Sequence, residues 1–109
     1  MTAHPDLAGI YATAGGPIGA AQAVKDAKKV GEVIVIAFDP LPQTIEYIKD
    51  GSIQGVIGQN PYAEGRDTVI RLFNYMMDGE LTEAKYMYTI ADIVTLETLE
   101  AFYRSGQKG

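Results

Sequence analysis

Short apolar segments alternate along this chain with longer segments in which apolar residues recur every three or four positions. The first pattern predicts strands at 7–13, 32–39, 53–59 and 85–90. The second predicts helices at 17–28, 42–50 and 61–78 and a short last helix capped by Thr95. Strands that alternate with helices across short joints are typical of βα units. We therefore predict an α/β fold, a parallel sheet with flanking helices.

Proline and glycine support these boundaries. Pro17 suits a first helical position, and Gly31, Gly51 and Gly79 each follow a predicted helix. The run 33–38 is apolar almost throughout, which predicts a central strand covered on both faces. The predicted inward residues are Ala20, Ala23, Val24 and Ala27, then Leu41, Ile45 and Ile48, then Tyr62, Val69, Phe73 and Met76, and finally Leu96, Leu99 and Phe102.

Composition restricts the classes of function. The chain has 109 residues, enough for one domain at most, and its 47% hydrophobic and 21% charged residues are typical of a globular protein. A net charge of -5 without a basic run argues against a nucleic-acid partner. The absence of cysteine excludes disulfides and thiolate sites. The first residues lack a signal-peptide pattern, and the run 33–38 is too short to span a bilayer.

Two polar side chains stand where apolar strands end. Asp39 closes the second predicted strand and Gln59 the third, with Thr13 after the first. Ligands of open parallel sheets bind outside the carboxyl ends of the strands. A carboxylate, an amide and a hydroxyl there suit the vicinal hydroxyls of a sugar. Asp39 is explained equally well as a turn residue before Pro40, and Gln59 as a polar residue that enters the next helix.

A second pattern, Ala14-x-Gly16-x-x-Gly19, is similar to a dinucleotide fingerprint, and Asp39 lies twenty residues beyond Gly19. A tight turn from a strand into a helix requires the same residues, and we favour that interpretation. Catalysis finds little support, because His4 is the only histidine and no catalytic triad or metal-ligand spacing occurs. We predict no enzyme, no metal and no cofactor.

Five segments carry a family resemblance that extends over nearly the whole chain. They are 5–13, 18–21, 37–39, 48–51 and 57–62. In order and spacing they resemble the C-terminal part of the type I periplasmic sugar-binding proteins, the ribose-binding-like receptors of carbohydrate ABC transporters. The resemblance implies a flavodoxin-like lobe, a sugar ligand, an ABC permease as partner of the parent protein, and a periplasmic or extracellular location.

The resemblance also implies site residues. Asp39 is similar to the family's carboxylate that binds sugar hydroxyls, and Gln59 to its hinge-side amide. Phe38, Thr13 and Ala14 complete the implied ligand-binding set. Family members usually carry an asparagine where this chain has Ala14, so the third polar contact departs from the pattern.

The family has two lobes that close by a hinge, and the resemblance covers part of them. It implies a single partial domain over 1–109, in which 1–59 resembles the C-terminal lobe, 60–90 crosses into the N-terminal lobe, and 91–109 returns. We therefore expect a truncated product, an engineered fragment or one part of a split protein. Open sheet edges in such a chain predict a homo-oligomer, a strand-exchanged oligomer or complementation by the missing half. Sugar affinity is expected to be weak or absent.

The function that follows from the resemblance is sugar binding for an ABC importer. Three alternatives are an effector-binding core of a LacI-like regulator, a standalone α/β association domain and a nucleotide-binding enzyme. An upstream helix-turn-helix would decide for the regulator. Cofactor binding that depends on Gly16 and Asp39 would decide for the nucleotide-binding enzyme.

Overall fold

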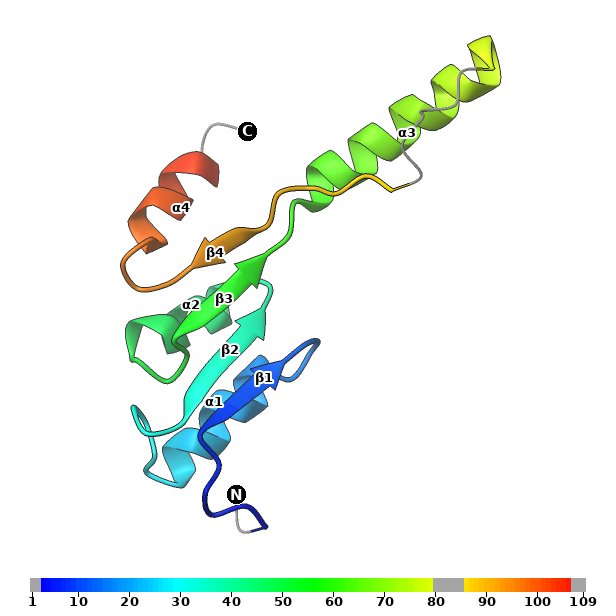
Figure 1. Ribbon diagram of the computed structural model, residues 1–109. Helices are drawn as coiled ribbons and strands as arrows, with labels where there is room; N and C mark the ends of the chain where they lie inside the picture. Colours follow the sequence, from blue (N-terminus) through cyan, green and yellow to red (C-terminus); the bar gives the residue numbers. More distant parts are fainter. Residues whose placement is uncertain (1–2, 80–85, 107–109) are drawn as a thin grey trace. The chain divides into compact units, whose positions relative to one another are not determined.

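The computed structural model describes residues 3–79 and 86–106 (Figure 1). The elements are β1 (Gly9–Ala12), α1 (Pro17–Asp26), β2 (Ile34–Phe38), α2 (Pro42–Lys49), β3 (Gly55–Gly58), α3 (Pro61–Asp78), β4 (Asp92–Val94) and α4 (Leu99–Gly106). They form two compact units: unit 1 combines Met1–Gly58 with Asp92–Gly109, and unit 2 is Gln59–Ala91. The α/β class is confirmed.

Unit 1 is built on a four-stranded sheet in the order β1-β2-β3-β4. The first three strands are parallel, with Ala12 opposite Ala37 and Phe38 opposite Ile57. β4 runs antiparallel to β3 and places Asp92 opposite Gly58. The predicted parallel βαβαβ order is confirmed, and β2 is a central strand of this sheet.

The core of unit 1 lies on one face of the sheet. Val35 and Ala37 of β2 and Val56 of β3 are fully buried there, in one cluster with residues of α1, α2 and α4. In Figure 1, α1 and α2 lie behind the strands. Successive right-handed connections that advance in one direction across a sheet place their helices on the same side, which accounts for this arrangement.

The prediction that β2 is covered on both faces is wrong. Its residues alternate, so Val35 and Ala37 are buried whereas Ile34 is 45% exposed. A continuous apolar run is typical of a strand between two helix layers. Among the described residues of unit 1 one helix layer is present, and no helix of unit 1 lies over the second apolar face of β2.

Several predicted inward residues of the helices are exposed. In α1 the buried residues are Pro17, Ala21 and Val24, while Ala23 and Ala27 face solvent. Alanine is too weakly apolar to decide which face of a helix is buried. Leu41 and Leu96 are also exposed, because each precedes the first turn of its helix and does not share its periodicity. Thr95 nevertheless accepts a hydrogen bond from the Thr98 N–H (3.3 Å).

Unit 2 contains α3, whose bounds are those predicted. Asn60 caps its start by accepting a hydrogen bond from the Ala63 N–H (3.0 Å), and Pro61 occupies the first turn. Gly79 ends it with φ 68°, a left-handed conformation that favours glycine. The helix, all of which is described, has no buried residue.

The predicted strand at 85–90 is wrong over its described part, residues 86–90, which have no strand structure. Lys85 lies outside the described residues. A strand needs a neighbour for its backbone groups, and no second strand is present among the described residues of unit 2. Thr89 instead donates a hydrogen bond to the Glu64 carboxylate on α3 (2.8 Å). The fourth strand is β4, at Asp92–Val94.

Within the described part of the chain, no helix is long and apolar enough to cross a membrane.

Candidate functional site

The carboxyl ends of the parallel strands form the candidate site. Thr13 and Ala14 follow β1, and Asp39 follows β2; all three are exposed. The register pairs Ala12 with Ala37, so these two strands end at the same edge of the sheet. Gln59 is the next residue in the chain after Gly58 of β3, and it is the first residue of unit 2. Unit 1 therefore brings three of the predicted site positions together at the carboxyl ends of its parallel strands.

Two tight turns follow the carboxyl ends of β1 and β2. The Gly16 N–H donates to the Ala14 carbonyl (2.7 Å), and the Leu41 N–H donates to the Asp39 carbonyl (2.8 Å). Each closes a three-residue turn directly beyond a strand. The turns leave the side chains of Ala14 and Asp39 exposed at the sheet edge. Their order in space follows from the order of the strands in the sheet.

Asp39 has an unusual backbone conformation. Its φ is 64°, in the left-handed region, and it precedes Pro40. Its N–H donates to the Ile57 carbonyl of β3 (3.0 Å), which extends the pairing of β2 with β3 by one residue. A non-glycine residue in this conformation is retained where the surrounding structure enforces it, and such residues cluster at ligand sites. The exposed carboxylate can accept hydrogen bonds from hydroxyl groups.

Gly58 lies against the Asp39 turn. A Cβ atom at this position would lie 3.4 Å from Pro40 Cγ and 3.5 Å from Asp92 Cβ. The absence of a side chain at Gly58 therefore lets the turn and β4 approach β3 closely. Asp92 is a further exposed carboxylate at the same sheet edge. Sequence reasoning missed it, because the fourth strand was placed at 85–90 rather than at β4.

Phe38 is half-buried on the sheet face that the helices leave uncovered. Its ring and the Tyr11 ring have centroids 5.9 Å apart and are tilted by 58°. The two residues come from neighbouring parallel strands, β2 and β1. The pair makes the uncovered face aromatic next to Asp39, a combination of an apolar ring and a carboxylate that suits a sugar.

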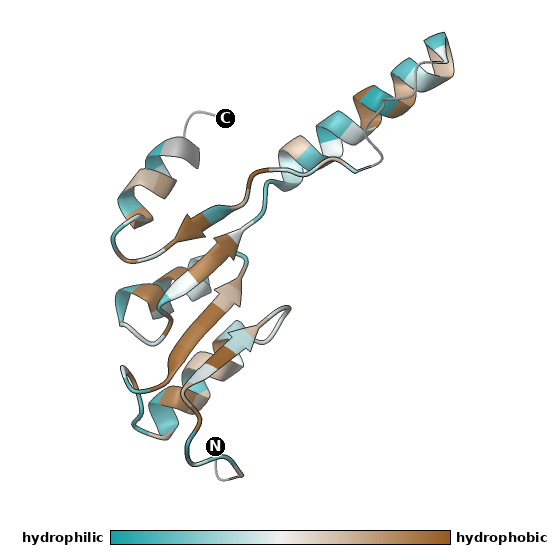
Figure 2. Cartoon of the chain, viewed as in Figure 1, coloured by the Kyte–Doolittle hydropathy of each residue, from teal (hydrophilic) through white to brown (hydrophobic). Residues whose placement is uncertain are grey.

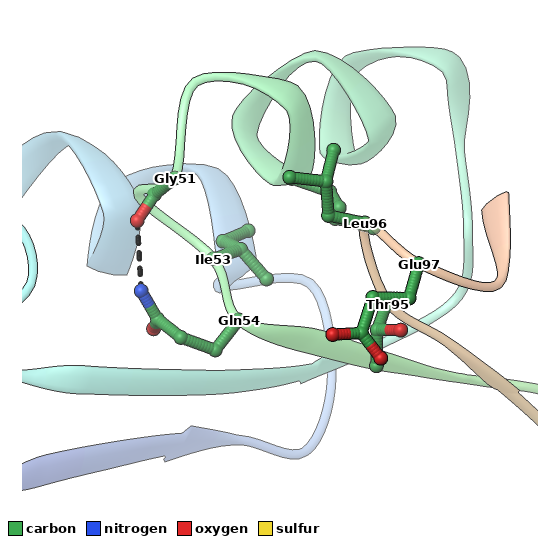
Figure 3. Close-up of a pocket in the computed structure, with 7 residues that line it drawn as sticks. Gly51, Ile53, Gln54, Thr95, Leu96 and Glu97 are labelled. Atoms are coloured by element: carbon green, nitrogen blue, oxygen red, sulfur yellow. Dashed lines mark hydrogen bonds between the residues drawn. The ribbon is translucent and has the colours of Figure 1, made fainter.

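A separate hollow of about 370 Å³ lies at the opposite end of β3 (Figure 3). Ile48, Ile53 and Leu96 form much of its wall. The Gln54 amide beside them is already engaged: it donates to the Gly51 carbonyl (2.7 Å) and accepts from the Val35 N–H (2.7 Å). The hollow therefore offers mainly apolar surface and is poorly suited to a hydroxyl-rich ligand.

The glycine pattern at the start of α1 forms a strand-turn-helix joint. In a dinucleotide fingerprint the third glycine permits close packing of the helix against the sheet. Gly19 does not have this role, because a Cβ atom added there would have no neighbour within 4 Å. The geometry thus favours the tight-turn interpretation. Among the described residues, no group of three or more His, Asp or Glu could hold a metal ion.

The ion pair between Lys25 of α1 and Asp50 at the end of α2 lies away from the candidate site (Nζ to Oδ2 2.6 Å). Partial burial acts to raise the pKa of Asp50, but hydrogen bonds from Lys25 and Ser52 outweigh it and lower that pKa. The hydrogen bond to Asp50 raises the pKa of Lys25. Both side chains remain substantially exposed, so this pair joins two helices rather than serving a ligand.

Comparison with known proteins decides the family. Residues 1–80 match the family model described as periplasmic binding protein domain. The chain belongs to this family. The resemblance to type I periplasmic sugar-binding proteins is therefore confirmed.

The relatives of this periplasmic binding protein domain are much longer than the chain. It is 33% identical over 87 residues to the ribose import binding protein RbsB of Salmonella typhimurium, and the match covers 79% of this chain and 29% of that protein. The chain thus spans less than a third of that relative's length.

Solved structures show the same fold. The glucose-galactose binding protein GanP from Geobacillus stearothermophilus superposes with a TM-score of 0.80 at 27% identity, covering 90% of this chain and 35% of GanP. An ABC transporter solute-binding protein from Burkholderia graminis, in complex with D-arabinose, gives a TM-score of 0.78 at 31% identity, with 90% and 35% covered.

Proposed function

We propose that this chain contributes one wall of the sugar site of a carbohydrate ABC-transporter solute-binding protein. The observation that carries the proposal is the exposed Asp39 carboxylate, which a left-handed turn holds at the carboxyl edge of the parallel sheet. The role is binding rather than catalysis. The proposal includes an ABC permease as partner and a periplasmic or extracellular location, in keeping with relatives named for ribose import and for ABC transport of solutes.

Each site residue has a proposed role. Asp39 accepts hydrogen bonds from two sugar hydroxyls, and the Thr13 hydroxyl donates or accepts one more. Gln59, which follows β3 in the chain, supplies an amide that both donates and accepts. Phe38 offers its ring to an apolar face of the sugar. Ala14 has no polar side chain, so its contribution is limited to its backbone and its small size.

A sugar titration followed by amide NMR tests the site. D-Ribose and D-arabinose are added to the chain, and we expect saturable shifts at the amides of Thr13, Ala14 and Asp39. Because the chain offers few polar contacts, the dissociation constant is expected on the order of 1 mM or weaker. Absence of saturable shifts at this edge, or shifts confined to the hollow beside Ile53, would contradict the proposal.

Asp39→Asn sharpens this test. Hydrogen bonds to a charged acceptor contribute about 1.5–3 kcal/mol each, so the variant is expected to bind about 10- to 100-fold more weakly. The matched control is Glu32→Gln, which neutralises an exposed acid before β2, at the other end of the strand. Equal affinity of Asp39→Asn and Glu32→Gln would remove Asp39 from the site.

A further inference from the structure

An aromatic pair lies next to the candidate site on the sheet of unit 1. The rings of Tyr11 in β1 and Phe38 in β2 have centroids 5.9 Å apart and planes tilted by 58°. The distance falls within the range that aromatic pairs prefer, and the tilt avoids the unfavourable face-to-face arrangement. Phe38 directly precedes Asp39, the carboxylate of the proposed sugar site. The contact that holds the Phe38 ring therefore bears on that site.

The core of unit 1 does not hold the Phe38 ring. Figure 2 shows β2 as apolar along its whole length, so both of its faces carry apolar side chains. Val35 and Ala37 are in the core cluster, and Phe38 alternates with Ala37 onto the opposite face of the sheet. Neither Phe38 nor Tyr11 belongs to the core cluster or packs against it. Within the described part of the chain, Tyr11 is the aromatic neighbour of Phe38.

The strand register places Tyr11 on the side of Phe38 that is away from the candidate site. Tyr11 lies opposite Ile36, and Phe38 is two residues further along the same face of β2. On the neighbouring strand β3, Ile57 lies opposite Phe38. Tyr11 thus supports the Phe38 ring from the amino-terminal side. The carboxyl end of β2, where Asp39 lies, is on the other side of the ring.

We propose that Tyr11 is a positioning residue of the sugar site and that it acts by holding the Phe38 ring in one orientation. This inference rests on the proposed function, in which the Phe38 ring contacts an apolar face of the sugar. A side chain that is ordered before the ligand binds loses less conformational entropy on binding. Tyr11 therefore increases the affinity for a sugar without contacting it.

The proposed role specifies a class of ligand. An aromatic ring held in one orientation favours a cyclic sugar, because a pyranose ring presents a rigid face of C–H groups to it. An acyclic polyol offers similar hydroxyl groups to Asp39 but has no rigid apolar face. We therefore expect Tyr11 to affect the binding of D-arabinose and to leave the binding of the acyclic D-arabinitol unchanged.

The exposure of Tyr11 makes the role testable. The side chain is 57% exposed, so its removal costs little burial and leaves the core cluster intact. Tyr11→Leu removes the ring, and Tyr11→Phe keeps the ring without the hydroxyl group. The matched control is Ile34→Ala, which removes an exposed apolar side chain from the same face of β2 at its other end. Circular dichroism of each variant verifies that unit 1 is folded.

The first measurement is the side-chain rotamer of Phe38 by NMR, and it needs no sugar. Three-bond couplings and contacts between ring protons report the χ1 angle. One rotamer is expected in the natural chain, in Tyr11→Phe and in Ile34→Ala, and averaging over rotamers is expected in Tyr11→Leu. An averaged Phe38 in the natural chain, or a single rotamer that persists in Tyr11→Leu, would overturn the proposal.

The second measurement is a double-mutant cycle of D-arabinose affinity with Tyr11→Leu, Phe38→Leu and the double variant. Each single variant is expected to bind about 3- to 10-fold more weakly than the natural chain. Because Tyr11 acts through Phe38, the double variant is expected to bind no more weakly than Phe38→Leu alone. Additive losses, or a loss in Tyr11→Phe equal to that in Tyr11→Leu, would show that Tyr11 contacts the sugar itself and would overturn the positioning role.

The same titrations separate this inference from the proposed function. If Phe38→Leu binds D-arabinose like the natural chain while Asp39→Asn binds it more weakly, the sugar site stands and the aromatic pair is not part of it. That result would overturn this inference alone. A natural chain that binds no sugar at this end of the sheet would overturn the proposed function and this inference with it. Equal weakening of D-arabinose and D-arabinitol binding in Tyr11→Leu would overturn the proposed preference for a cyclic sugar.

Discussion

Unit 1 and unit 2 use similar proportions of apolar residues in different ways. In unit 1, alternate residues of the strands meet three helices in a single cluster whose members, such as Val35 and Val56, are fully buried. In unit 2, the described residues are a helix with no buried residue and segments without regular secondary structure. Local signals form a helix in both units, but among the described residues only unit 1 supplies a layer that its helices pack against. Helical periodicity therefore identifies a surface that needs a partner, and says nothing of where that partner is.

The largest difference is expected from matched isoleucine truncations. Ile48→Ala, in α2, removes a fully buried side chain and is expected to lower the free energy of unfolding by about 2–5 kcal/mol. Ile70→Ala, in α3, removes a side chain that is half exposed, and its effect is expected within about 0.5 kcal/mol. Urea unfolding at low protein concentration measures both. Equal losses would contradict the assignment of the core to unit 1 alone.

A smaller effect is expected at the end of β3. Gly58→Val introduces a side chain where Pro40 Cγ and Asp92 Cβ approach closely, and overpacking of this kind costs about 1–3 kcal/mol. It should also disturb the Asp39 turn. Gly15→Val is the control, because a Cβ atom there has no neighbour within 4 Å. Unfolding midpoints that rank the two variants in the reverse order would show that β3 and its neighbours are more loosely packed than described.

Glycine-to-alanine changes inside the two helices compare the units more finely. Gly19 in α1 and Gly65 in α3 both have open space around an added Cβ atom. Alanine stabilises a helix interior by about 0.5–1 kcal/mol relative to glycine. We expect Gly19→Ala to raise the unfolding midpoint of unit 1. Gly65→Ala is expected to raise only the helical circular dichroism signal, and a matching increase of the midpoint would contradict the assignment of the described core to unit 1.

The smallest effect concerns pH. Hydrogen bonds lower the pKa of Asp50 in the folded chain below its ordinary value of 3.8. The stabilisation is therefore present above that pH and is lost as the pH falls through the lowered folded pKa. Asp50→Asn should remove this part of the acid destabilisation of unit 1, by a small amount because the pair is exposed. The free energy of unfolding of both proteins is measured between neutral pH and a pH of about 3. An equal decrease in the natural chain and in Asp50→Asn would show that the Lys25–Asp50 pair does not contribute to the acid sensitivity.

Much of the fold could be predicted because its signals are local. Asn60, Pro61 and Gly79 fix the ends of α3 through caps that depend on neighbouring residues alone. The parallel order of β1 to β3 followed from the alternation of elements. The prediction of a strand at 85–90 was wrong over its described part, because a strand needs a neighbouring strand for its hydrogen bonds. Alternation of apolar residues does not show whether such a neighbour is present. The prediction that β2 is covered on both faces was wrong for a related reason. An apolar run shows that a strand can be buried on both faces, but it does not show whether the fold supplies helices for both.

The candidate site was predicted in part. Asp39 was identified by its place after an apolar strand, and its positive φ was not readable from sequence because aspartate accepts many conformations. Asp92 was missed because its position depends on pairing with β3. The roles of Thr13, Ala14, Phe38 and Gln59 stay predictions that the sugar titration addresses.

Hydrogen exchange at low and at high protein concentration tests the central claim most directly. The claim is that unit 1 has its own core and that α3, none of whose residues is buried, has none. Amides of β2 are expected to be protected at both concentrations, and amides of α3 are expected to exchange much faster than those of β2 at the low concentration. Strong protection of α3 at the low concentration, equal to that of β2, would contradict the account.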